Sequence, residues 1–296
     1  MTRSATSATS AASASSPVSA AAAAAAAETF RRFELASWER VAEHYVASWE
    51  TLTSLFAAPL LAALAVRPGA RLLDVACGAG CVTAAAHAMG AAALGVDFAR
   101  AMIEQARRRH PELTFEQADA EALPFAPASF EILAMGFGVL HLARPERAFA
   151  EARRVLRRGG RFGFTVWAGP EECAGERLVG GVLAAAGDPE VEAPPGPPPR
   201  RFGDPEECRR ALGDAGFARE SLTFVTHGGT WLLRRPDELF EIERRAGVRT
   251  AALLARQPPA RLAAIRDAMR EAVARHRTAA GYAIPMAAHV VTARAG

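Results

Sequence analysis

The chain has 296 residues, and all 35 of its basic residues are arginine, because no lysine occurs in the sequence. Mechanisms that require a lysine amine are therefore excluded, namely Schiff-base and pyridoxal-phosphate chemistry, a Walker A phosphate loop and a protein-kinase ATP site. A net charge of +3 is too small to predict nucleic-acid binding, and 50% hydrophobic residues are enough for a large core.

The first 28 residues differ in composition from the rest. Residues 1–28 are rich in serine and alanine and carry almost no large apolar side chains. Such a segment buries too little surface to offset the entropy of ordering, so we predict a disordered extension at 1–28 and a folded domain at 29–296.

Four cysteines lack both a CxxC pair and histidines at ligand spacing, so neither a zinc site nor a disulfide framework is expected. No window reaches the length needed to span a membrane. These features favour a cytoplasmic protein without a bound metal, a membrane span or a nucleic-acid partner.

Apolar periodicity predicts the elements in chain order. Helices are expected within 29–67, followed by alternating strands and helices in a core at 68–233. The expected strands are 71–76, 92–96, 113–117, 130–137 and 160–167, and the helices between them are 82–89, 99–109 and 145–156. This alternation predicts an α/β fold that is Rossmann-like and doubly wound, with a mainly parallel sheet.

The last third follows a different pattern. A proline-rich loop at 194–199 precedes a helix at 205–215 and a strand at 220–233. Residues 234–282 are predicted to form a helical lid, and 283–296 the final strand. An apolar stripe in the lid, made of Leu262, Ile265, Met269 and Val273, either covers a substrate or pairs with a second subunit, so both a monomer and a homodimer remain open.

The most informative segment is a strand that runs into a glycine-rich loop, LLDVACGAG at 72–80. Its glycines allow a ligand to approach the backbone, and the following helix offers free N–H groups. The loop fails the dinucleotide fingerprint, because Thr83 stands where a third glycine is required and Asp74 would repel a pyrophosphate. A ligand with a cation and no phosphate suits the loop better.

Two further acids follow the next predicted strands. Asp97 ends the strand after the glycine loop, where it could accept both hydroxyls of a ribose, and Asp119 follows the third strand. With Asp74 they place one carboxylate near the end of three successive parallel strands, the edge where open α/β sheets bind ligands.

These motifs resemble the class I S-adenosylmethionine-dependent methyltransferases, especially the ubiquinone/menaquinone-type and small-molecule enzymes of secondary metabolism. The resemblance covers about 38–167, through LLDVACGAG, ALGVDFARAMIEQAR, FEQADAEALPF and the segment from FEILAMG to FTVW. It is looser afterwards, although PMAAHVVTARA is similar to the family's final strand. It implies seven strands with an antiparallel last strand.

The resemblance also implies S-adenosyl-L-methionine as cofactor and a role for each matching residue. Asp74 and the 78–80 backbone would hold the methionine portion, Asp97 the ribose, and Asp119 the adenine amino group. The implied cofactor residues are Asp74, Ala76, Gly78, Gly80, Asp97, Phe98, Met102, Asp119, Ala120 and Met135. Ala76 departs from the glycine found in many members.

A sulfonium methyl is already activated, so the protein mainly positions the acceptor and excludes water. His141, just past the fourth strand, is the candidate base, with a rim residue of no chemical role as the alternative. No metal-ligand cluster and no Asp-Pro-Pro-Tyr type motif follows that strand, which disfavours metal-dependent catechol methylation and nucleobase methylation.

Aromatic side chains outside the cofactor half are candidates for a substrate pocket, and ordinary core packing is the alternative for each. They are Tyr45, Trp49, Trp167, Trp231 and Phe240. We therefore expect a methyltransferase that acts on a moderately apolar small molecule at oxygen. A quinone-type C-methyltransferase is the alternative, and a cofactor-binding protein without methyl transfer is a third hypothesis.

Overall fold

The computed structural model describes residues 17–192 and 195–296. One mixed sheet forms the centre, with strand order β3-β2-β1-β4-β5-β8-β6. Its strands are β1 (Arg71–Val75), β2 (Ala92–Asp97), β3 (Thr114–Gln117), β4 (Phe130–Met135), β5 (Leu156–Trp167), β6 (Phe217–Leu233), the short β7 (Arg277–Thr278) and β8 (Gly281–Ala295). Strands β1 to β5 pair in parallel, whereas β8 is antiparallel to both β5 and β6. The predicted Rossmann-like sheet with an antiparallel last strand is confirmed.

Helices cover both faces of this sheet. On one face, α6 (Pro145–Val155) and α8 (Pro205–Asp214) pack on a core that contains Leu73. On the other face, α3 (Ala57–Ala63) and α4 (Cys81–Ala88) pack against Leu72. Because both faces are covered, β1 reads as an almost continuous apolar run instead of an alternating one.

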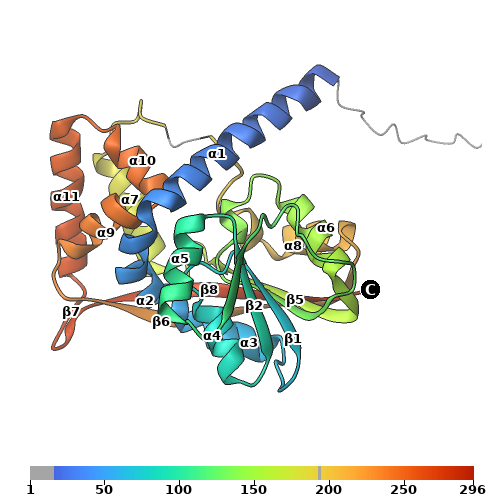
Figure 1. Ribbon diagram of the computed structural model, residues 1–296. Helices are drawn as coiled ribbons and strands as arrows, with labels where there is room; N and C mark the ends of the chain where they lie inside the picture. The colour runs from blue at the N-terminus through green and yellow to red at the C-terminus, as the bar shows by residue number, and fades with distance from the viewer. Residues whose placement is uncertain (1–16, 193–194) are drawn as a thin grey trace, which may run out of the picture.

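A group of helices lies at one end of the sheet (Figure 1). It comprises α7 (Ala174–Ala186), α9 (Glu238–Ala246), α10 (Arg249–Ala255) and α11 (Pro259–Ala274). The last three occupy the predicted lid segment, but α7 was not expected from the sequence. The apolar stripe of α11 packs on α7 within the same chain through Ile265 and Met269, both fully buried, so neither proposed partner for that stripe is correct.

The amino-terminal helix α1 (Pro17–Ala47) crosses the molecule, and α2 (Trp49–Thr53) and the short η1 (Ser54–Phe56) follow it (Figure 1). Residues 17–28 form the first turns of α1, so the helix begins before the boundary expected at residue 28. Good helix propensity keeps the alanine run helical although residues 21–26 are exposed. Residues 1–16 of the predicted extension lie outside the described part.

Within the described ranges, no single helix has both the length and the apolar character for crossing a membrane. One bent pair, Ala21–Ala47 with Trp49–Ala63, meets the criterion only when its two helices are taken together.

Candidate active site

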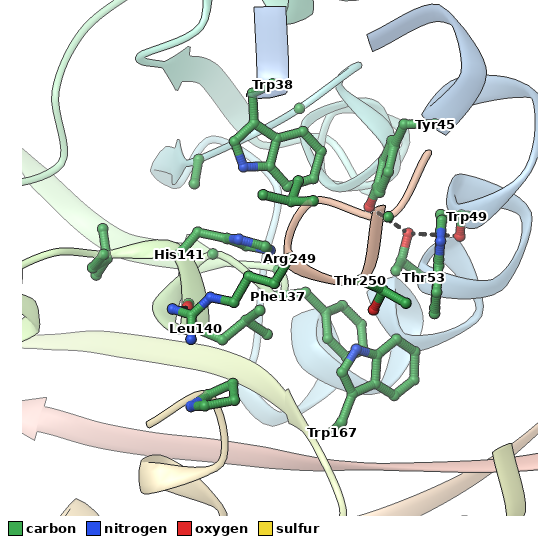
Figure 2. Close-up of a pocket in the computed structure, with 18 of the residues that line it drawn as sticks. Trp38, Tyr45, Trp49, Thr53, Phe137, Leu140, His141, Trp167, Arg249 and Thr250 are labelled. Carbon is green, nitrogen blue, oxygen red and sulfur yellow. Dashed lines mark hydrogen bonds between the residues drawn. The ribbon is translucent and has the colours of Figure 1, made fainter. Parts of the chain in front are cut away.

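A cavity of about 540 Å³ opens at the carboxyl ends of the parallel strands. Its walls come from the loops after β1 to β4, from the end of β5, and from α1, α2, α7, α9 and α10. Figure 2 shows the labelled aromatic side chains of Trp38, Tyr45, Trp49, Phe137 and Trp167 around this cavity, with His141 and Arg249 among them. The loops of the sheet and the helical segments therefore enclose one common space.

The glycine-rich loop turns sharply between β1 and α4. Ala76, Gly78 and Gly80 all have positive φ, at 54°, 55° and 91°. Gly78 faces open space in the cavity, whereas a Cβ on Gly80 would lie 2.7 Å from the ring of Phe115. Gly78 thus allows close ligand approach, and Gly80, which does not line the cavity, allows the loop to pack on β3.

Asp97 is buried and already organised by the backbone. Its carboxyl oxygens accept from the N–H groups of Gly78 and Ala99, both at 2.9 Å. Burial nevertheless raises its pKa to about 6. The carboxyl lines the cavity, so a ligand with hydroxyl groups could bind it there.

Asp74 is fully buried behind the glycine loop and is not part of the cavity wall. One oxygen accepts from the Thr83 hydroxyl at 2.7 Å, and the other has no hydrogen-bond partner. Burial raises the pKa of Asp74 to about 7. An orphaned buried carboxyl oxygen is costly, and a ligand group that hydrogen-bonds to it would relieve this cost.

Asp119 lines the cavity but is bound by the protein itself. Arg31, from α1, donates to its Oδ2 from Nε at 2.9 Å and from Nη2 at 2.7 Å. The remaining oxygen accepts from the Glu121 N–H at 2.9 Å. A ligand at Asp119 would therefore share the carboxyl with Arg31, which the sequence analysis did not identify.

The other predicted cofactor residues divide into two groups. Ala76, Phe98, Met102 and Ala120 line the cavity. Met135 does not, because its side chain is buried in the core, and the backbone that follows it reaches the cavity instead.

Phe137, in that following segment, has a φ of 55°, which is unusual for a bulky residue and marks local strain. Two contacts hold it: its N–H donates to the Thr165 hydroxyl at 2.9 Å, and its ring stacks on Trp167 at 4.2 Å. The strained backbone thereby directs an aromatic side chain into the cavity.

His141 lies at the end of η2 (Val139–His141) and lines the cavity. Its Nδ1 is 2.9 Å from a carboxylate oxygen of Glu34, a fully buried residue of α1. The other oxygen of Glu34 lies 3.3 Å from Nε of Arg249. With Nδ1–H donating to Glu34, Nε2 carries the free lone pair, which is the tautomer that a general base needs.

Arg249 is itself fixed by several contacts. It donates to the carbonyl oxygens of Pro197 at 2.9 Å and Leu140 at 3.0 Å, and its guanidinium lies 4.5 Å from the centre of the Phe30 ring. These contacts keep the positive charge beside Glu34, so the carboxylate is held for His141 by an arginine from the lid segment.

The predicted substrate aromatics are only partly brought together. Tyr45, Trp49 and Trp167 line the cavity. Phe240 is a buried core residue, and Trp231 lies behind Trp49 with ring centres 4.6 Å apart. Neither Phe240 nor Trp231 lines this cavity, because both side chains pack in the core between β6 and α9.

Comparison with known proteins shows what kind of domain carries these loops. Residues 73–164 match a protein family described as methyltransferase domain. The chain contains a class I methyltransferase domain. The match covers the glycine-rich loop, Asp97, Asp119 and His141.

The methyltransferase domain is also similar to curated proteins. A demethylmenaquinone methyltransferase of Beutenbergia cavernae is 36% identical over 120 residues, which are 40% of this chain and 50% of that protein. A ubiquinone/menaquinone biosynthesis C-methyltransferase of Rhizobium leguminosarum is 41% identical over 106 residues, 32% of this chain and 40% of that protein. The chain thus spans half or less of the length of these relatives.

A solved structure agrees with the fold. A putative methyltransferase of Bacillus halodurans has a TM-score of 0.50 and 19% identity, over 80% of this chain and 97% of that one. The likeness extends beyond the matched domain and shows the fold alone.

The family's cofactor is S-adenosylmethionine, and the residues of the methyltransferase domain fit it. Its ribose hydroxyls suit Asp97, which lines the cavity. Asp74 has an orphaned oxygen but does not line the cavity, so its contact with the ammonium group of the methionine portion stays a prediction. Gly78 leaves open space beside them.

Replacement of Ala76 by glycine is expected to stabilise the methyltransferase domain by about 0.5–1 kcal/mol. Relief of the left-handed strain on an L-residue exceeds the entropy cost of a glycine. Chemical denaturation measures the change. Ala85→Gly, inside α4, is the control and should lower stability by about 0.5–1 kcal/mol. Equal destabilisation by both substitutions would show that Ala76 is not strained.

Sequence reasoning missed Arg31, Glu34 and Arg249. For Glu34 a signal existed, because it lies between Phe30 and Trp38 at four-residue spacing, on the apolar face of the predicted helix. Arg31 and Arg249 could not be found in this way. Arg31 is 88 positions from Asp119 and Arg249 is 215 positions from Glu34, and ion pairs at such separations leave no local pattern.

Proposed function

We propose that this protein transfers the methyl group of S-adenosylmethionine to a ring carbon of a moderately apolar small molecule of phenol or quinol type. The observation that carries the proposal is the shared cavity. Its wall contains the cofactor candidates Gly78 and Asp97, the aromatic side chains of Tyr45 and Trp167, and the His141 imidazole. A methyl donor and an apolar acceptor could therefore occupy the same enclosed space.

The choice of carbon rests on the comparisons. The relatives named above are menaquinone-type methyltransferases, and one of them is a C-methyltransferase by name. They support C-methylation, which was the alternative in the sequence analysis, better than methyl transfer to oxygen. Since they match only the cofactor half of the chain, the substrate of this protein is inferred from the cavity and not from theirs.

The His141–Glu34 pair supports this chemistry. A ring carbon is a poor nucleophile until a neighbouring hydroxyl loses its proton, so a base in the cavity assists C-methylation of a phenol. His141 would take the proton at Nε2, and Glu34 would stabilise the resulting imidazolium through Nδ1–H. Aromatic walls exclude water from the displacement.

Mass spectrometry tests the proposal directly. Cell extracts incubated with the protein and S-adenosylmethionine carrying a labelled methyl group should yield a labelled product with a new carbon–carbon bond. A label on oxygen would contradict the carbon assignment and support the other acceptor atom. Absence of any labelled small molecule across extracts that contain phenols and quinols would contradict methyl transfer to this substrate class.

A further inference from the structure

Half of the buried carboxyl groups in the described part of the chain are paired with arginine. Six such side chains are buried in the described part of the chain, namely Glu34, Glu50, Asp74, Asp97, Glu121 and Glu243. Glu34 is paired with Arg249, Glu50 with Arg109 and Glu121 with Arg144. A buried carboxylate without a cation is costly, so the three exceptions need a reason.

Of the three exceptions, Asp97 lines the cofactor end of the cavity, and Asp74 lies buried behind the glycine-rich loop. The third, Glu243, lies on α9, far along the chain from the glycine-rich loop. Its side chain is 2% exposed, it lines the same cavity, and among the described residues it forms no salt bridge. Like Asp97, Glu243 is thus a buried carboxyl without an arginine partner that lines the cavity.

The Glu243 carboxyl lies beside Gly247 and Thr250. A Cβ built on Gly247 would lie 2.9 Å from its Oε2, so the absence of a side chain at Gly247, which also lines the cavity, leaves room for this carboxyl. Burial raises the pKa of Glu243 to about 8, and the Thr250 hydroxyl beside it opposes the shift. A cationic ligand group beside this carboxyl would favour its charged form.

Among the described residues, the arginines that line this cavity already bind carboxylates: Arg31 binds Asp119, Arg200 binds Glu176 and Arg249 binds Glu34. Trp49 lines the cavity with Glu243, and the same two residues line a small adjoining cavity together with Trp231. The nearest other carboxylate, Glu176 on α7, already binds Arg200 at 2.8 Å. A carboxylate beside indole rings is the combination that binds an ammonium group.

We propose that Glu243 is a specificity-determining residue that binds a protonated amine of the substrate. The inference rests on the proposed function, because it takes the cavity to be the substrate site, and it narrows the substrate to an aromatic amine-bearing molecule. The ring would occupy the aromatic walls, and the amine would form an ion pair with Glu243.

Two probes that differ only in the amine test this proposal. Tyramine and 4-ethylphenol are titrated into the full chain saturated with S-adenosylhomocysteine, and binding is followed by tryptophan fluorescence. Tyramine should bind about 10- to 100-fold more tightly, the range expected for a hydrogen bond to a buried charge. Equal affinities, or no binding of tyramine at millimolar concentration, would overturn the proposal.

Two variants test whether Glu243 causes the preference for tyramine. Glu243→Gln keeps the shape of the side chain but removes its charge. In this variant tyramine should bind about as weakly as 4-ethylphenol, and the affinity for 4-ethylphenol should be unchanged. Glu241→Gln is the matched control on α9, because Glu241 binds Arg244 at 2.9 Å and does not line the cavity. An undiminished preference in Glu243→Gln would assign the amine to another residue.

The pH dependence of the wild-type protein is an independent readout that needs no variant. The tyramine preference should rise by about tenfold or more between pH 6 and pH 8, because the amine needs the ionised form of Glu243. The other charged groups near Glu243 in the cavity wall are Glu176 on α7, its partner Arg200, and Arg249 on α10. A flat preference over this range would contradict the role of Glu243.

S-adenosylhomocysteine binding, measured first, separates the two proposals. Failure to bind S-adenosylhomocysteine would count against the proposed function. Normal S-adenosylhomocysteine binding without a tyramine preference would count against the amine inference alone.

Discussion

Replacement of His141 by alanine is expected to slow methyl transfer by about 10²- to 10⁴-fold, the usual contribution of a general base. The imidazole lines the cavity, and Glu34 holds its Nδ1 at 2.9 Å, which leaves Nε2 for the acceptor proton. Single-turnover rates with the acceptor found by isotope labelling measure the effect, because they separate chemistry from product release.

Two further variants define the role of the histidine. Glu34→Gln should slow transfer by about 10- to 100-fold and alter the pH profile of the rate, because the imidazolium loses its negative partner. His87→Ala, on the exposed side of α4, is the control and should keep the normal rate. A normal rate in His141→Ala would reduce His141 to a rim residue.

Replacement of Asp97 by alanine is expected to weaken cofactor binding by about 1–3 kcal/mol, through loss of charge-assisted hydrogen bonds. The carboxyl is buried, lines the cavity and is oriented by the Gly78 and Ala99 N–H groups. Calorimetric titration with S-adenosylhomocysteine measures the change. Asp267→Ala, a half-exposed acid on α11, is the control and should bind normally.

The pKa of Asp97 predicts how cofactor affinity changes with pH. Since burial raises that pKa to about 6, the carboxyl loses its charge as the pH falls through 6. S-adenosylhomocysteine affinity should therefore fall by about tenfold between pH 7 and pH 5, and Asp97→Asn should flatten this part of the profile. Unchanged affinity in Asp97→Ala would place the ribose elsewhere.

The strands of the cofactor half were predicted to within a few residues, because aspartate, glycine and proline follow short apolar runs there. The five strands β1 to β5 all appear in the expected order. Helix α7 was missed because Gly180 and Gly181 interrupt its helical pattern. It is helical nonetheless, since Leu178 and its neighbours pack on α11, and tertiary packing overrides weak propensity.

The candidate site was predictable only where it is local in sequence. Asp97 and Gly78 follow strands, and strand ends converge on one edge of a parallel sheet. The partnership of Glu34, His141 and Arg249 joins α1, η2 and α10 across the cavity, which no spacing rule can indicate. The strain at Phe137 was likewise invisible, because the apolar run predicted a strand that continued to residue 137.

Calorimetry with S-adenosylhomocysteine tests cofactor binding itself, on which the proposed methyl transfer and the roles of Asp97 and His141 depend. We expect one site per chain, with affinity lowered in Asp97→Ala and retained in Asp267→Ala. No heat of binding at millimolar concentrations of S-adenosylhomocysteine would contradict it.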